Sequence, residues 1–230
     1  MTTYERKYVW ETPVRLWHWT HFASMFVLAI TGIYIGNPFI IPGVSESLQA
    51  EGVSLMALVR LIHFSAAIAL TMSMILRLYW FIAGNGFSNW KAWFPIYSRK
   101  SAKEALGLMG QQIKYYLFMR QDPPHGFAHN PLAALTYTIM LLLLIIEVLT
   151  GWALYGQGSP GGVFWRLFSW LFSLGGNQTV RLVHHLAMWI LIVLFTAHLY
   201  LAIRDDNLSD SGTMSSMFSG YKYRRSGGKH

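Results

Sequence analysis

The chain has 230 residues, of which 53% are hydrophobic and 12% are charged, and its formal net charge is +8. Soluble domains usually carry about 25% charged residues, so this composition excludes an ordinary soluble domain and indicates a membrane protein. Cysteine is absent, which excludes disulfides, iron–sulfur ligation by this chain and covalent attachment of c-type haem. Nine histidines remain as the strongest candidate ligands for a transition metal.

In chain order, a polar N-terminal stretch comes before four apolar segments. Met1–Glu11 precedes an apolar run that is too long for a signal peptide and has no small-residue cleavage site, so we expect it to be retained. Each apolar segment approaches the roughly 20 residues that cross a bilayer, and most have Trp or Tyr near their ends, as membrane interfaces favour. The predicted spans are Trp17–Gly36, Val59–Ala83, Pro131–Tyr155 and Leu182–Ile203.

The basic residues gather on one side of these spans. They lie before the first span, between the second and third, and after the fourth, whereas the other connections and their borders hold only Arg60, Arg166 and Arg181. The positive-inside rule therefore predicts that both termini and the Gly84–Ala128 loop are cytoplasmic. Because topology explains the net charge, we expect no nucleic-acid partner. The expected fold is a single all-α membrane domain over residues 1–230, built as a four-helix bundle.

Shorter elements are expected outside the spans. Ala102–Met119 has a basic, partly amphipathic pattern that predicts a helix along the cytoplasmic membrane surface. The aromatic segment Phe164–Leu174 is too short to cross a bilayer and predicts an interfacial helix on the outer side. The polar tail Asn207–His230 is expected to be ordered only by a partner.

Histidines fall at two depths within the predicted spans. His184 and His198 are 14 residues apart, so in one helix they share a face and lie about 21 Å apart along the axis. His63 begins the second span at the outer depth of His184, and His18 lies at the cytoplasmic depth of His198. Neutral imidazoles from facing helices can clamp a haem. The spacing predicts two haems stacked across the bilayer, with His63 and His184 on the outer iron and His18 and His198 on the inner iron.

Two alternatives remain open for these histidines. A lone histidine in a helix is more often a hydrogen-bonded structural residue than a ligand, although ionisable residues within membrane spans usually serve function. His21 is the rival of His18, because the two are three residues apart on neighbouring helical positions. The depth of His18 is closer to that of His198, which favours His18.

Four further residues are candidate haem contacts. Gly32, on the inward face of the first span, would let a flat macrocycle approach the backbone at the outer level; ordinary small-residue packing is the alternative. Arg77 lies 14 residues after His63 and either pairs with a haem propionate or snorkels to the cytoplasmic surface. Arg60 and Arg181 each precede an outer ligand by three residues and are propionate partners or interface anchors.

The start of the third span carries polar residues at the inner level. His129 and Asn130 are expected to border the inner haem, where a lipid-soluble quinone can enter from the bilayer and needs hydrogen-bond partners and a proton route. Asn130 before Pro131 is alternatively an ordinary helix N-cap. Glu147 lies deep in the same span, where its burial is costly, so it should face the bundle interior or a polar cavity. Its role is not indicated by the sequence.

Six stretches carry a wider pattern: Val9–Trp19, Arg60–Phe64, Arg77–Trp80 with Gly84 and Asn85, His129–Ala133, His184–Trp189 and Ser216–Lys222. In order, and over nearly the whole chain, they resemble the b-type cytochrome subunits of membrane-bound nickel–iron hydrogenases, which are related to the cytochrome b subunits of formate dehydrogenases. Carried over by motif, the family's haem ligands fall on His18, His63, His184 and His198. The resemblance implies a dihaem four-helix protein with two haem b groups, multi-pass in the bacterial inner membrane.

The resemblance also implies partners and a direction of electron flow. The chain would anchor the small and large subunits of a periplasmic hydrogenase, amid membrane lipid and in one or several copies. Electrons from the small subunit's iron–sulfur chain would enter the outer haem, cross to the inner haem and reduce quinone. The chain itself would carry electrons in this respiratory chain and catalyse nothing alone.

Two other functions remain open at this point. A cytochrome b subunit of a formate dehydrogenase or thiosulfate reductase would use the same ligand geometry with a different partner. A haem-free membrane anchor or transporter would use the histidines to carry protons instead.

Overall fold

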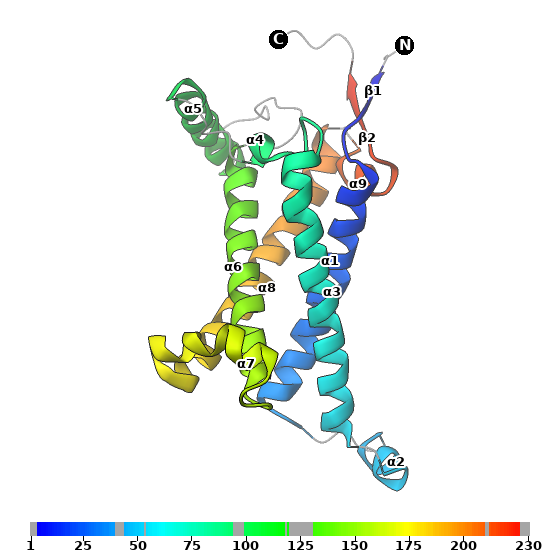
Figure 1. The fold of residues 1–230 in the computed structure, drawn as a ribbon. Helices are drawn as coiled ribbons and strands as arrows, with labels where there is room; N and C mark the ends of the chain where they lie inside the picture. The colour runs from blue at the N-terminus through cyan, green and yellow to red at the C-terminus, as the bar shows by residue number, and fades with distance from the viewer. Residues whose placement is uncertain are drawn as a thin grey trace.

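The computed structural model describes residues 4–39, 44–52, 54–93, 99–117, 119, 131–209 and 212–225. Four long helices form its bundle: α1 (Thr12–Gly36), α3 (Leu55–Ala83), α6 (Pro131–Gly156) and α8 (Gly176–Ser209) (Figure 1). Each is long and apolar enough to cross a bilayer. The four predicted spans are therefore confirmed as helices, and each helix extends beyond the span that hydropathy indicated.

The shorter elements gather at the two ends of the bundle (Figure 1). One end holds both termini and we call it the terminal end; its elements are β1 (Tyr4–Tyr8), α4 (Trp90–Trp93), α5 (Arg99–Tyr116), α9 (Thr213–Ser219) and β2 (Tyr221–Arg225). The opposite end holds α2 (Val44–Ala50), α7 (Val163–Phe168) and the 3-10 helix η1 (Ser169–Leu174). Both short helices that the sequence predicts are thus present, as α5 and as the pair α7 and η1.

The two strands join the ends of the chain. β1 pairs antiparallel with β2, with Tyr4 opposite Arg225 and Tyr8 opposite Tyr221. Just before β2, Gly220 has φ +86°, and its carbonyl accepts hydrogen bonds from the N–H groups of Val9 and Trp10 at 2.8 and 3.1 Å. A Cβ there would lie 2.6 Å from the Tyr8 ring, so only glycine fits. The expectation that a partner alone orders the tail is wrong for residues 212–225. β1 pairs with residues 221–225, and the indoles of Trp10 and Trp19 donate hydrogen bonds to the Ser216 hydroxyl and the Met217 carbonyl in α9.

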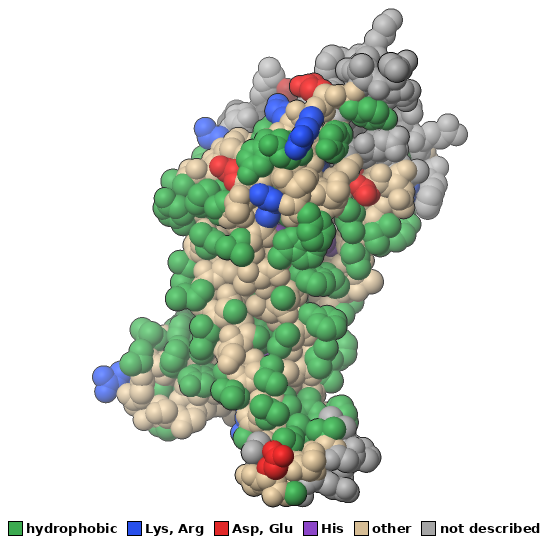
Figure 2. Space-filling view, turned by 90° about the vertical axis from the view of Figure 1, so that its right-hand side faces the viewer, with side chains coloured by type: hydrophobic (Ala, Val, Ile, Leu, Met, Phe, Trp, Pro, Cys, Tyr) green, Lys and Arg blue, Asp and Glu red, His purple; other side chains and the backbone are tan. Residues whose placement is uncertain are grey.

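The long helices pack as two pairs. α1 lies along α3 and α6 lies along α8, whereas α3 and α6 meet over a much smaller area. A hydrophobic core nevertheless joins the pairs, formed by Leu70, Met74, Phe81, Trp93, Leu141, Leu144 and Leu191. Figure 2 shows hydrophobic side chains over the middle of one face of the molecule and charged side chains near its two ends. A bundle surrounded by lipid turns its apolar side chains outward in this way.

A partly buried acidic residue ties elements together at the terminal end. One carboxylate oxygen of Glu11, at the start of α1, accepts hydrogen bonds from the Trp80 indole and the Asn85 N–H, both at 2.9 Å, and from the Ser88 hydroxyl at 3.0 Å. Burial raises the pKa of Glu11, but the hydrogen bonds from Asn85, Trp80 and Ser88 outweigh burial, and the pKa lies below its ordinary value of 4.5. These bonds tie α1 to the end of α3.

We predict that Glu11→Gln lowers the free energy of unfolding by about 1.5–3 kcal/mol, the range for hydrogen bonds to a charged group. Thermal unfolding of the purified protein in detergent measures this. Because the folded-state pKa of Glu11 is lowered, its contribution is fully present above the ordinary pKa of 4.5 and is lost as pH falls through the lowered value. The difference between the two proteins should therefore shrink on acidification.

The matched control is Glu5→Gln, because Glu5 is exposed on β1; this change should leave the midpoint of unfolding unaltered. Equal midpoints for wild type and Glu11→Gln at neutral pH would contradict the role of Glu11.

Candidate functional site

A cavity of about 770 Å³ lies between the two helix pairs and is lined by residues of all four long helices. This volume falls within the roughly 300–1,000 Å³ typical of small-molecule and cofactor sites. Leucines line the part of the cavity toward the middle of the bundle: Leu70, Leu144 and Leu191. Polar side chains line the part toward the opposite end: Arg60, Gln157, Ser159, Arg181 and His185. The cavity therefore has an apolar interior and a basic mouth.

His63 and His184 both line this cavity, from α3 and α8, and lie within electrostatic range of each other. The His63 ring is fixed by α1: the Thr31 hydroxyl donates to the Val27 carbonyl at 2.7 Å and lies 2.8 Å from Nδ1 of His63. Because the hydroxyl hydrogen is already used, Thr31 accepts the hydrogen of Nδ1. Nε2 of His63 therefore keeps the lone pair that binds a metal.

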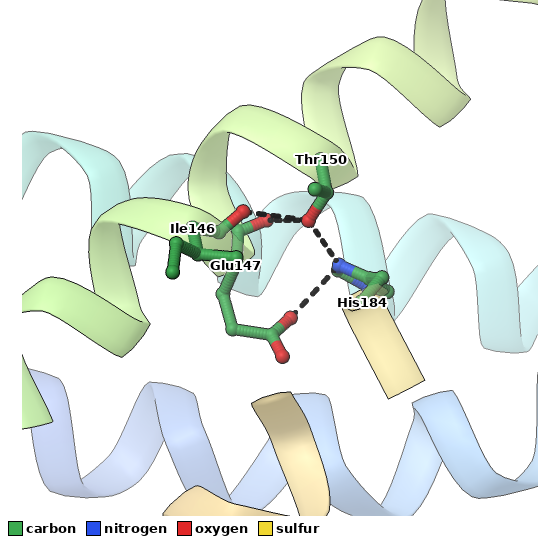
Figure 3. Close-up of polar contacts among 4 residues, drawn as sticks. All are labelled: Ile146, Glu147, Thr150 and His184. Carbon is green, nitrogen blue, oxygen red and sulfur yellow. Dashed lines mark hydrogen bonds and ion pairs between the residues drawn. The ribbon is translucent and has the colours of Figure 1, made fainter. Parts of the chain in front are cut away.

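The same arrangement recurs for His184, with one addition. The Thr150 hydroxyl of α6 donates to the Ile146 carbonyl at 2.6 Å and lies 2.9 Å from Nδ1 of His184. Glu147, one turn earlier, places a carboxylate oxygen 2.8 Å from the same nitrogen (Figure 3). The prediction that Glu147 faces the interior or a polar cavity is confirmed, because Glu147 lines the cavity.

Glycines keep space open around the rings. A Cβ on Gly32 would lie 3.5 Å from Cε1 of His63, and one on Gly151 would lie 3.3 Å from Cε1 of His184. The ring of His185 is turned against α1, where a Cβ on Gly36 would lie only 2.8 Å from its Cε1. Larger side chains at these positions would fill the cavity or displace the imidazoles.

The other two predicted ligands lie together nearer the terminal end. His18 of α1 and His198 of α8 are within electrostatic range of each other. The His198 ring meets the Tyr137 ring edge-on at 5.3 Å between centroids. Within the described part of the chain, Nδ1 of His18 has no hydrogen-bond partner. These two histidines do not line the cavity that holds His63 and His184.

His21, the rival of His18, is more deeply buried and better anchored. It is 5% exposed, and its Nδ1 lies 2.8 Å from the Ser73 hydroxyl and 3.2 Å from the Trp17 carbonyl. The Ser73 hydroxyl donates to the Leu70 carbonyl, so it accepts from Nδ1. Nε2 of His21 has no partner among the described residues. The hydrogen bonds that anchor Nδ1 thus favour His21 as the metal ligand, whereas proximity to His198 favours His18 as the ligand.

The candidate arginines have contrasting surroundings. Arg77 is 1% exposed, and its guanidinium lies over the rings of Phe81, Trp93 and Trp17 at 4.3, 4.5 and 5.0 Å. The alternative in which Arg77 snorkels to the surface is therefore wrong. Arg60 and Arg181 are exposed at the cavity mouth.

The candidate quinone residues His129 and Asn130 lie outside the described residues.

The sequence did not predict the three hydroxyl partners Thr31, Ser73 and Thr150. A helical threonine or serine commonly bonds the carbonyl of its own preceding turn, so its presence in a span indicates no external partner. A weak signal existed for Thr150, since it lies three residues after Glu147 and therefore on the same helix face.

The residues around the cavity fit a haem. Two imidazoles present metal-binding nitrogens from facing helix pairs, glycines leave room for a flat ring, and guanidinium groups stand at the mouth, where propionates would need them. Ligand imidazoles usually donate their other nitrogen to an oxygen acceptor, as both rings here do.

Comparison with known proteins identifies the group. The family described as prokaryotic cytochrome b561 matches residues 9–220. The chain is 38% identical over 218 residues to the probable Ni/Fe-hydrogenase B-type cytochrome subunit of Rhizobium leguminosarum bv. viciae, covering 93% of this chain and 87% of the relative. It is 37% identical to that of Cupriavidus necator, with 94% and 86% covered. It is 34% identical to the probable Ni/Fe-hydrogenase 1 B-type cytochrome subunit of Escherichia coli (strain K12), with 96% and 92% covered.

These matches extend over nearly the whole chain, as the resemblance of the six stretches predicts. A b-type cytochrome carries haem b, which the cavity residues fit. The chain therefore belongs to the prokaryotic cytochrome b561 family, among the Ni/Fe-hydrogenase B-type cytochrome subunits, and is a multi-pass membrane electron carrier rather than a catalytic subunit.

Proposed function

We propose that the chain carries two haem b groups, one above the other in the bundle, and passes electrons from a nickel–iron hydrogenase to membrane quinone. The observation that carries this proposal is the cavity shared by His63 and His184, in which each Nδ1 is held by a hydroxyl of the neighbouring helix. When bound, haem b supplies a one-electron iron couple. The protein supplies ligation, orientation and burial.

At the cavity, His63 and His184 are the residues that would hold the iron of the outer haem. Gly32 would leave room for the ring, and Arg60 and Arg181 at the mouth would pair with its propionates. The leucine-lined part of the cavity is apolar, which lowers the dielectric around the site.

Nearer the terminal end, His18 and His198 are the proposed ligands of the inner haem, supported by their mutual proximity. Arg77 is the proposed propionate partner. Its Nε and one terminal nitrogen have no hydrogen-bond partner among the described residues, so they are available to an anion.

The proposed orientation places the terminal end in the cytoplasm, because the basic residues gather on that side of the spans. The hydrogenase small and large subunits would then dock at the opposite end, on the periplasmic side of the bacterial inner membrane. Quinone would be reduced beside the inner haem, with His129 and Asn130 as its candidate contacts. Each electron carried inward against 100 mV involves about 2.3 kcal/mol, so haem order has an energetic consequence.

We predict that His63→Ala and His184→Ala each remove one of two haems, because a single imidazole cannot hold the iron from both sides. The haem content per polypeptide, measured as pyridine haemochrome on the purified chain, should fall to half in each variant. His185→Ala is the matched control from the adjacent position of α8, and it should keep both haems. Full haem content in His63→Ala would refute the pairing.

The choice between His18 and His21 generates a separate prediction. His18→Ala should lose the second haem, whereas His21→Ala should keep both haems and lose only the bonds to Ser73 and Trp17. Low-temperature absorption and electron paramagnetic resonance spectra of the two variants distinguish these results. Loss of a haem in His21→Ala together with retention in His18→Ala would assign the ligand to His21 instead.

A further inference from the structure

The two imidazoles at the cavity have different partners on their outward nitrogens. Nδ1 of His63 meets only the neutral hydroxyl of Thr31, at 2.8 Å, among the described residues. Nδ1 of His184 meets the hydroxyl of Thr150 at 2.9 Å and the carboxylate of Glu147 at 2.8 Å (Figure 3). One face of the cavity therefore has a negative charge behind its imidazole and the other does not.

The direction of these hydrogen bonds follows from the donors. Thr150 has already given its hydrogen to the Ile146 carbonyl, and a carboxylate has none to give. In this arrangement the single hydrogen of His184 Nδ1 is shared between the two oxygens, which favours the tautomer that leaves Nε2 as the metal-binding nitrogen.

The carboxylate of Glu147 that contacts His184 lies at a depth where burial of a charge is unfavourable. Its side chain is 13% exposed in the middle of α6, where neighbouring turns are apolar, and a carboxylate buried at that depth is costly. A hydroxyl alone suffices to orient the ring of His63. The carboxylate is thus not required merely to fix a tautomer.

We propose that Glu147 is a positioning residue that acts through His184 to lower the reduction potential of the outer haem. This inference rests on the proposed function, in which His184 ligates that haem. A carboxylate that accepts the Nδ1 hydrogen makes Nε2 a stronger electron donor to the iron. Its negative charge also favours the more positively charged oxidised state, and the low dielectric of the cavity strengthens that effect.

The consequence is a difference in reduction potential between the two haems, which arises from the chain's own residues. The haem that receives electrons first is held at a lower potential than a hydroxyl partner alone would give. Onward transfer to the inner haem is favoured accordingly, since electrons move toward the higher potential.

The test is an optical redox titration of the haem-loaded, full-length chain carrying Glu147→Gln. Glutamine keeps the shape and an amide oxygen acceptor but removes the charge. The potential of one haem should rise by at least the equivalent of a tenfold change in its ratio of reduced to oxidised forms, which is about 59 mV. The other haem should be unchanged. Glu147→Asp, which keeps the charge, should restore a potential near that of wild type.

Glu104→Gln is the control, because Glu104 is an exposed carboxylate on α5; it should shift neither haem. Full haem content with unchanged potentials in Glu147→Gln would overturn the proposal. If that variant loses haem, Glu147→Ser, which supplies a neutral hydroxyl, must show the same rise. Loss of haem in both neutral variants would make Glu147 structural and would also overturn it. Retention of both haems in His184→Ala would instead refute the proposed function.

Discussion

Hydrogen bonds from histidine Nδ1 to a hydroxyl on the paired helix are the interaction on which the bundle depends. They join His63 to Thr31, His21 to Ser73 and His184 to Thr150, so that the α1–α3 pair contains two and the α6–α8 pair contains one. Each hydroxyl also donates to a carbonyl of its own helix, which forces it to accept from the imidazole. The apolar surroundings of a membrane-spanning bundle strengthen such bonds, so they fix ring orientation as well as helix pairing. The opposite nitrogen of each ring remains for a ligand.

The space between the pairs divides into two different environments. Toward the end that holds α2 and α7, Gly32 and Gly151 leave space beside the histidine rings. The cavity there has Arg60 and Arg181 at its mouth. Toward the terminal end, the buried guanidinium of Arg77 lies over the rings of Trp17, Phe81 and Trp93. Under the proposed function, two haems of the same chemical type would therefore experience different charge and solvent access, which are the properties by which proteins set haem potentials.

Hydropathy predicts the four long helices well, because a bilayer imposes their length and composition. The 14-residue spacing also predicts that His184 and His198 share a face, and His63 and His18 do lie near them. The sheet of β1 and β2 was not predicted. Its strands lie at opposite ends of the chain, and each is too short to show the alternating pattern of a strand alone. The partners Thr31 and Thr150 escaped prediction because a helical threonine usually satisfies itself. Depth alone could not separate His18 from His21, since one helical turn covers both.

Under the proposed function, one chain connects an electron donor to quinone through two haems. The most direct test is a difference spectrum of the intact hydrogenase complex before and after hydrogen is added, combined with the haem count per cytochrome polypeptide. We expect two haem b groups per polypeptide and reduction of both by hydrogen, followed by reoxidation when a quinone is supplied. A count of one haem, or b-type haem that stays oxidised under hydrogen in an active complex, would contradict it.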